Sequence, residues 1–175
     1  MERIKGKIGV VYPTFEEYPH RKNPQDIVAY YPQTKDLTYT AEDLENHFHD
    51  KDIEALLLIN PDNPSGNMIP APDCLRLAKW CMDRNIRFIL DESFVDFCED
   101  WENSSMLKNE ILQAYPSMVV VKSISKSYGV PGLRLGVLAS ADEELISWIK
   151  KDVSIWNINS FGEFYMQIFN KYEKD

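Results

Sequence analysis

The 175-residue sequence lacks several features that would place it in common classes of protein. It has no apolar run long enough to cross a membrane and no signal-peptide core behind its first residues, so we expect a soluble, cytoplasmic protein. It is also short of basic residues, with 19 lysines and arginines against 28 aspartates and glutamates, a formal charge of −9. Nucleic acids and anionic membranes bind basic surfaces, so this balance argues against both partners.

Cysteine is scarce, and the three cysteines form neither an even disulfide framework nor a C-x-x-C pair. Cys74 and Cys81 lie seven positions apart in a helical pattern, so we expect them to share one buried face. The run His47-Phe48-His49-Asp50 could be a fragment of a metal site. Because no matching cluster of ligands occurs elsewhere in the sequence, we expect no metal.

What the sequence has is a regular alternation of apolar runs and helical patterns. Short apolar runs predict strands, and continuous ones are typical of strands buried on both faces; they lie at 6–11, 26–31, 55–59, 87–90, 118–121 and 135–139. Amphipathic patterns predict helices, the first with Thr40 as its N-cap and the others at 72–84, 106–115, 141–151 and 160–172. This order predicts an α/β fold of three layers, with a mostly parallel sheet between helices.

Unusual polar residues follow three of these buried strands. Asn60 and Asn63 come after the strand at 55–59, Asp91 after the strand at 87–90, and a run with Lys126 after the strand at 118–121. The carboxyl ends of neighbouring parallel strands open into one crevice, so we expect these side chains to meet.

Each of these residues also has a plain structural interpretation. Lys126 offers an amine that could form a Schiff base, and the neighbouring hydroxyls with Arg134 suit an anion such as phosphate, but most loop lysines are simply solvated. Asp91 could cap a helix or pair with a buried arginine instead of serving as the counter-ion of a ligand. Asn63, between two prolines, could be a turn former.

Three motifs in order make a more specific pattern. They are Asn-Pro-x-Asn-Pro-Ser-Gly at 60–66, Asp-Glu-x-x-x-x-Phe at 91–97, and Ser-x-Ser-Lys-x-x-Gly-x-x-Gly-x-Arg-x-Gly at 123–136. In order and spacing they resemble the fold-type I pyridoxal-phosphate enzymes, and within these the class I/II aminotransferases of the histidinol-phosphate aminotransferase and threonine-phosphate decarboxylase kind. The resemblance covers residues 60 to 136.

The resemblance implies a cofactor, pyridoxal 5'-phosphate, and a role for each matching residue. Lys126 would hold the cofactor covalently and, once freed by a substrate amine, would move a proton between the α-carbon and the cofactor. Asp91 would keep the cofactor's pyridine nitrogen protonated, and Asn63 would hydrogen-bond the ring hydroxyl. The implied substrates are an amino acid and a 2-oxo acid.

The phosphate of the cofactor would be held by the third motif. Ser123 and Arg134 are the implied contacts, with Ser125 a weaker candidate for the same work. Members of the family usually act as homodimers, so the resemblance implies self-association of a full-length parent.

Two departures from the family pattern affect the expected function. Phe94 stands where many aminotransferases have a tyrosine that also reaches the ring hydroxyl, which leaves decarboxylation of a phosphorylated amino acid open beside amino-group transfer. The chain also resembles only the middle of such an enzyme, residues 1–175 being a partial large domain. We expect the missing parts to include the small C-terminal domain, further phosphate contacts and the aromatic ring that stacks on the cofactor. A non-catalytic domain that keeps the fold without turnover is therefore the third interpretation.

Overall fold

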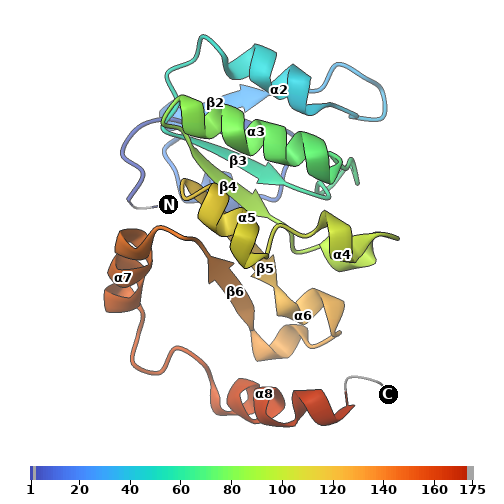
Figure 1. Cartoon of the computed structure of the whole chain (residues 1–175), viewed down its shortest axis with the longest axis vertical. Coiled ribbons are helices and arrows are strands. Elements are labelled where there is room, and N and C mark those ends of the chain that lie inside the picture. Colours follow the sequence, from blue (N-terminus) through green and yellow to red (C-terminus); the bar gives the residue numbers. More distant parts are fainter. Residues whose placement is uncertain (2, 173–175) are drawn as a thin grey trace.

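The computed structural model describes residues 1 and 3–172 and contains a six-stranded sheet in the order β2-β1-β3-β4-β5-β6 (Figure 1). The strands are β1 (Ile8–Val11), β2 (Ile27–Tyr30), β3 (Ala55–Ile59), β4 (Arg87–Asp91), β5 (Met118–Ser123) and β6 (Gly136–Ala139). Strands β1 to β5 pair in parallel, whereas β6 pairs with β5 in the antiparallel sense and forms one edge. The predicted α/β fold with a mostly parallel sheet is confirmed.

The helices lie between the strands in the chain. They are α1 (Glu17–His20), α2 (Ala41–Phe48), α3 (Ala71–Asp83), α4 (Trp101–Ser104), α5 (Asn109–Ala114), α6 (Ile124–Ser127), α7 (Glu143–Asp152) and α8 (Ser160–Tyr172). Short 3-10 turns add η1 (Pro24–Asp26), η2 (Val95–Phe97) and η3 (Pro131–Leu133). Thr40 is the predicted N-cap of α2, where its hydroxyl accepts from the Asp43 backbone and the Asp43 carboxylate accepts from the Thr40 backbone.

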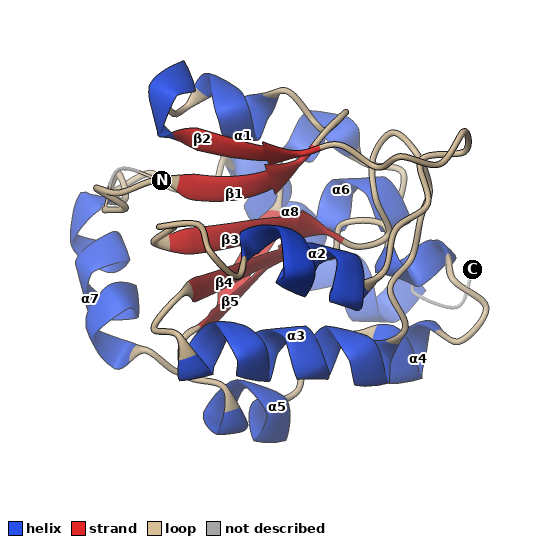
Figure 2. Cartoon of the chain, turned by 90° about the horizontal axis from the view of Figure 1, so that it is seen from above, coloured by secondary structure: helices blue, strands red, loops and turns tan. Residues whose placement is uncertain are grey.

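Helices α2, α3 and α5 cover one face of the sheet, as Figure 2 shows. The larger core lies there, because continuous apolar strands meet the apolar stripes of these helices. Cys74 and Cys81 of α3 are buried in it at 1% and 0% exposure, which confirms the shared face. A smaller apolar cluster on the other face is built around Ile8, Val10 and Leu57.

The region around α5 differs from the prediction. Residues 101–104, where the sequence predicts no helix, form the short helix α4, which has no side-chain cap. Helix α5 begins at Asn109 and not at Met106, because the buried Glu92 carboxylate accepts hydrogen bonds from the Met106 backbone N–H and the Ser105 hydroxyl. Residues just before α5 are thereby tied to the end of β4 rather than to a helix.

Helix α8 lies apart from the sheet, beyond α6 in Figure 1. Phe169 packs edge-to-face on Tyr128 with 4.7 Å between ring centroids, whereas Phe161 and Phe164 are 79% and 60% exposed. No helix among the described residues is both long enough and apolar enough to span a bilayer.

Candidate active site

The carboxyl ends of the parallel strands lie at one edge of the sheet, on the side where α6 is seen in Figure 2. A cavity of about 460 Å³ opens there. Four of the residues singled out from the sequence line it, namely Asp91, Ser123, Lys126 and Arg134. The cavity thus brings together four of the six candidate site residues, and Asn63 and Ser125 lie outside it.

Lys126 lies on α6, which follows β5 directly. The side chain is exposed, and its ammonium nitrogen lies 4.1 Å from the ring centroid of Phe94 and 5.8 Å from that of Phe15. Both distances are within the range of cation–π attraction. The amine is thus held at the cavity between two aromatic rings.

Asp91 is the last residue of β4 and is only 6% exposed. Its Oδ1 accepts a hydrogen bond of 2.9 Å from the Ser93 backbone N–H, and its Oδ2 accepts one from the Tyr18 hydroxyl. Among the described residues, no lysine, arginine or histidine forms an ion pair with Asp91. Burial, followed by the charge of Asp91, raises the pKa of Tyr18 far above its ordinary value, so Tyr18 remains a proton donor.

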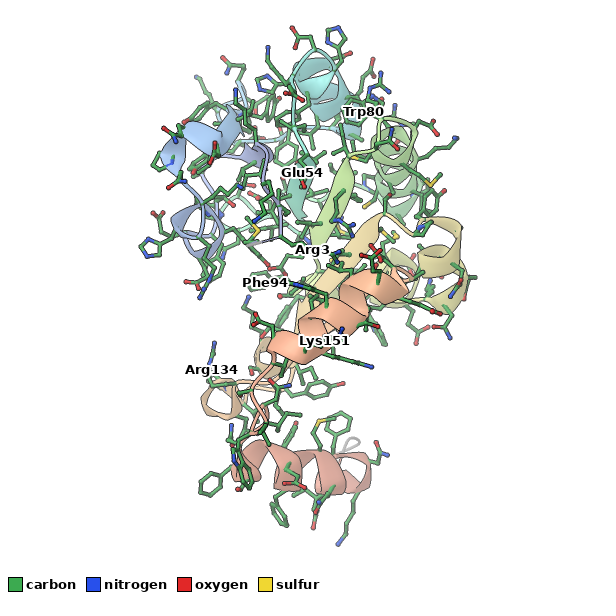
Figure 3. All side chains as sticks on the ribbon, turned by 90° about the vertical axis from the view of Figure 1, so that its left-hand side faces the viewer. Arg3, Glu54, Trp80, Phe94, Arg134 and Lys151 are labelled. Atoms are coloured by element: carbon green, nitrogen blue, oxygen red, sulfur yellow. The ribbon has the colours of Figure 1, made fainter. Side chains whose placement is uncertain are left out.

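The anion-binding candidates Ser123 and Arg134 flank the turn that carries Lys126. Ser123 ends β5, and its backbone N–H donates to the Ser93 hydroxyl at 2.9 Å. Arg134 has a left-handed backbone with φ of 56° and projects outward from the segment between α6 and β6 in Figure 3. Its Nη1 lies 3.5 Å from the Pro131 carbonyl oxygen, a long contact that leaves the guanidinium able to bind an anion. A Cβ at Gly136 would lie 3.2 Å from the Lys122 carbonyl oxygen, so the start of β6, two residues after Arg134, lies close to the backbone of β5.

Two predicted site residues lie elsewhere. Ser125 is buried, and its hydroxyl donates to the Leu135 carbonyl at 3.3 Å and accepts from the Leu135 N–H at 3.2 Å, so it braces the loop and does not line the cavity. Asn63 lines a separate cavity of about 410 Å³. Phe94 lines that second cavity too and contacts the Lys126 amine, which places its ring at the boundary of the two spaces.

Sequence reasoning missed two aromatic residues of the site. They lie in residues 13–24, where the sequence predicts neither a strand nor a helix, yet Phe15 lines the Lys126 cavity and Tyr18 hydrogen-bonds Asp91. The chain thus brings an aromatic ring, that of Phe15, to the wall of the cavity. The signal was available, because this segment follows the carboxyl end of β1, which lies at the same edge of the sheet as the other motifs.

The fold and cavity define an α/β protein with a polar cavity at the carboxyl ends of its parallel strands. Residues 8–167 match the family model of aminotransferase class I and II, and the chain belongs to this family. Pyridoxal 5'-phosphate is the cofactor of the family.

Three similar proteins agree with this assignment. The chain is 31% identical over 166 residues to the L-serine phosphate decarboxylase of Sulfurospirillum multivorans, covering 93% of this chain and 42% of that protein. A solved decarboxylase from the same organism superimposes with a TM-score of 0.80 at 28% identity, covering 99% of this chain and 49% of the other. The histidinol-phosphate aminotransferase from Clostridium acetobutylicum gives a TM-score of 0.78 at 25% identity, covering 91% and 47%. The chain spans less than half the length of each.

The groups at the cavity fit pyridoxal phosphate in kind. The amine of Lys126 could bind the aldehyde of the cofactor covalently. The buried Asp91 carboxylate could accept a hydrogen bond from its protonated pyridine nitrogen, because Asp91 lacks a cationic partner among the described residues. The guanidinium of Arg134 and the hydroxyl of Ser123 suit a phosphate. The ring of Phe15 offers an apolar wall.

Proposed function

We propose that this chain holds pyridoxal 5'-phosphate at the Lys126 cavity, as the cofactor-binding part of an enzyme that acts on an amino acid. The observation that carries the proposal is the carboxylate of Asp91, which is 6% exposed at the wall of that cavity and supported by two neutral donors. A buried carboxylate without a cation is costly, and a ligand that brings a protonated nitrogen to it removes that cost.

Each side chain then has a defined task. The cofactor, when bound, supplies an electron sink for the bonds of the substrate α-carbon. Lys126 would hold the cofactor covalently through its amine, with the carbonyl oxygen leaving as water, and as a free amine would accept a proton from the substrate α-carbon or return it. Asp91 would accept a hydrogen bond from the protonated ring nitrogen and favour that protonation. Arg134 and Ser123 would bind the phosphate, and the ring of Phe15 would form an apolar wall beside the cofactor.

Cofactor binding can be tested by trapping. The protein is mixed with pyridoxal phosphate, reduced with borohydride, digested and mapped by mass spectrometry. We expect a stoichiometric adduct on Lys126 that Lys126→Ala abolishes and that Lys79→Ala, a change at an exposed lysine of α3, leaves intact. An adduct spread over surface lysines, with none in excess on Lys126, would show that the site does not hold the cofactor.

For the reaction of the whole protein, decarboxylation of a phosphorylated amino acid is the candidate that the relatives favour. The S. multivorans relative, which matches 93% of this chain, is named an L-serine phosphate decarboxylase. The position of Phe94 supports this choice, since its ring, which has no hydroxyl, lies against the Lys126 amine. Amino-group transfer to a 2-oxo acid, the reaction that gives the family its name, is the second candidate.

Product analysis separates the candidates. With pyridoxal phosphate and O-phosphoserine, decarboxylation releases carbon dioxide and leaves phosphoethanolamine, whereas amino-group transfer requires added 2-oxoglutarate and forms glutamate. We expect release of carbon dioxide that does not depend on 2-oxoglutarate. Formation of glutamate without carbon dioxide would establish amino-group transfer. A stoichiometric Lys126 adduct without either product would establish a cofactor-holding domain without turnover.

A further inference from the structure

The helix that carries Lys126 is too short to be rigid by itself. Helix α6 comprises four residues, and no side chain caps its N-terminus. A helix of one turn is unstable in isolation, because forming the first turn costs more conformational entropy than its hydrogen bonds return. Contacts with other segments must therefore fix the position of the Lys126 amine.

The Ser125 hydroxyl and the Leu135 backbone provide one such contact, on the buried side of α6. A second is made by Asp96, which lies in η2, five residues after Asp91. Its Oδ1 accepts from the Lys122 ammonium at 2.6 Å, and its Oδ2 accepts from the hydroxyl of Ser127. The three side chains, Asp96, Lys122 and Ser127, are here called the Asp96 clamp.

The Asp96 clamp joins three parts of the site. Lys122 lies on β5, Ser127 is the residue after Lys126 on α6, and Asp96 belongs to the segment that follows Asp91. The ion pair is half-buried, with 16% of the Lys122 side chain and 21% of the Asp96 side chain exposed. Charge-assisted hydrogen bonds in such surroundings are stronger than those between solvated surface charges.

The same segment also touches the Lys126 amine itself. Phe94, two residues before Asp96, has its ring centroid 4.1 Å from the Lys126 ammonium. The segment 94–96 thus contacts the amine through a ring and anchors its helix through a carboxylate. This segment therefore contacts the side-chain amine of Lys126 and also holds the helix that carries its backbone.

We propose that Asp96 is a positioning residue for Lys126, holding α6 through Ser127 and Lys122 so that the amine stays at the cavity that Asp91 lines. The mechanical part of this inference concerns this chain alone. The consequence for cofactor affinity rests on the proposed function.

The first experiment needs no cofactor. Hydrogen exchange of the backbone amides is compared in the unmodified protein, Asp96→Asn and Ser127→Ala. The matched control is Asp83→Asn, which breaks the exposed ion pair of 2.9 Å between Lys79 and Asp83 on α3. We expect Asp96→Asn to accelerate exchange by about tenfold or more in residues 124–129 and to leave exchange in β3 and β4 unchanged. Loss of a charge-assisted hydrogen bond raises the equilibrium constant for local opening by about that factor. Ser127→Ala, which keeps the Lys122 pair, should give a smaller change in the same segment.

The outcome of this experiment decides the inference. Acceleration throughout the sheet, without excess in 124–129, would mean that Asp96 serves only global stability and would overturn the inference. Equal exchange in Asp96→Asn and Asp83→Asn would also overturn it. If Asp96→Asn does not fold, the decision passes to Ser127→Ala, whose exchange must rise in 124–129 alone.

The second experiment measures pyridoxal phosphate affinity by borohydride trapping over a range of cofactor concentrations. We expect the half-saturating concentration to rise about tenfold in Asp96→Asn and to stay within twofold in Asp83→Asn. If the unmodified protein forms no Lys126 adduct, the proposed function fails, and local exchange alone decides the role of Asp96. If it forms the adduct and Asp96→Asn forms it at the same concentrations, positioning of the amine by Asp96 is refuted.

Discussion

The hydrogen bond from the Tyr18 hydroxyl to Asp91 allows a quantitative test of the site without any ligand. The bond joins the segment after β1 to the end of β4, across 73 positions of sequence. A hydrogen bond to a charged group contributes about 1.5–3 kcal/mol to folding. We therefore expect Tyr18→Phe to lower the free energy of unfolding by about 2 kcal/mol near neutral pH, measured by urea denaturation.

A double-mutant cycle isolates the charge-assisted part of this contribution. In Asp91→Asn the acceptor is neutral, and a neutral hydrogen bond is worth about 1 kcal/mol. The loss caused by Tyr18→Phe should then be about 1 kcal/mol smaller in the Asp91→Asn background than in the unmodified protein. Tyr31→Phe, at a tyrosine that is 59% exposed, is the control and should change stability by less than about 0.5 kcal/mol.

The pH dependence gives a second signature of the same bond. Burial and Asp91 raise the pKa of Tyr18 in the folded state above the ordinary value of 10.0, which the unfolded state keeps. The contribution of Tyr18 to the free energy of unfolding is therefore complete below pH 10.0 and decreases as the pH rises towards the folded-state pKa. Between about pH 9 and pH 11 the stability difference between the unmodified protein and Tyr18→Phe should shrink by about 1.4 kcal/mol. A difference that is constant over this range, together with additive effects in the cycle, would refute the assigned bond.

Three further changes test other parts of the fold by urea denaturation. Burial raises the pKa of Glu92 above 4.5, so Glu92 contributes to the free energy of unfolding below that pH, and this contribution is lost as the pH rises. The stability of Glu92→Gln relative to the unmodified protein should therefore increase between about pH 4 and pH 7. A constant difference in the free energy of unfolding would contradict this. Asp142 caps α7 through the Leu145 N–H and pairs with Arg87 at 3.0 Å, which lowers its pKa below 3.8. Asp142→Ala should therefore cost about 1 kcal/mol at neutral pH and progressively less as the pH falls below 3.8, and a cost that does not change with pH would refute the cap. Leu57 is 2% exposed in β3, so Leu57→Ala should cost about 3 kcal/mol, and a cost below about 1 kcal/mol would mean that the site is not closely packed.

The sheet was predictable because its central strands have strong local patterns. Residues 55–59 and 88–90 are continuous apolar runs with polar residues at both ends, which few other structures accommodate. The short helix α4 was not predictable, since four residues without a side-chain cap are too few to show a helical periodicity. The start of α5 depended on the buried carboxylate of Glu92, a contact between segments 14 positions apart, and no local pattern encodes it.

In the candidate site too, the features set by local sequence could be predicted, whereas those set by contacts between distant segments could not. Lys126 and Asp91 could be placed because each lies at or within three residues of the carboxyl end of a strand, and strand direction fixes where such residues lie. Ser125 could not be assigned from its type, because only the packing of the loop shows that its hydroxyl is used by Leu135. Tyr18 was missed because its importance comes from a partner distant in sequence.

The antiparallel direction of β6 has a consequence for how the site can vary. Every other pair of neighbouring strands in the sheet is parallel, whereas β5 and β6 are antiparallel and are joined directly by residues 124–135, which carry both Lys126 and Arg134, eight positions apart. The spacing of these two cationic groups is therefore set within one connection, and the other connections of the sheet can change in length without altering it. One residue inserted between Lys126 and Arg134 would change the path of the chain between the amine and the guanidinium. Length variation among relatives should therefore be concentrated in the other connections and excluded from residues 126–134.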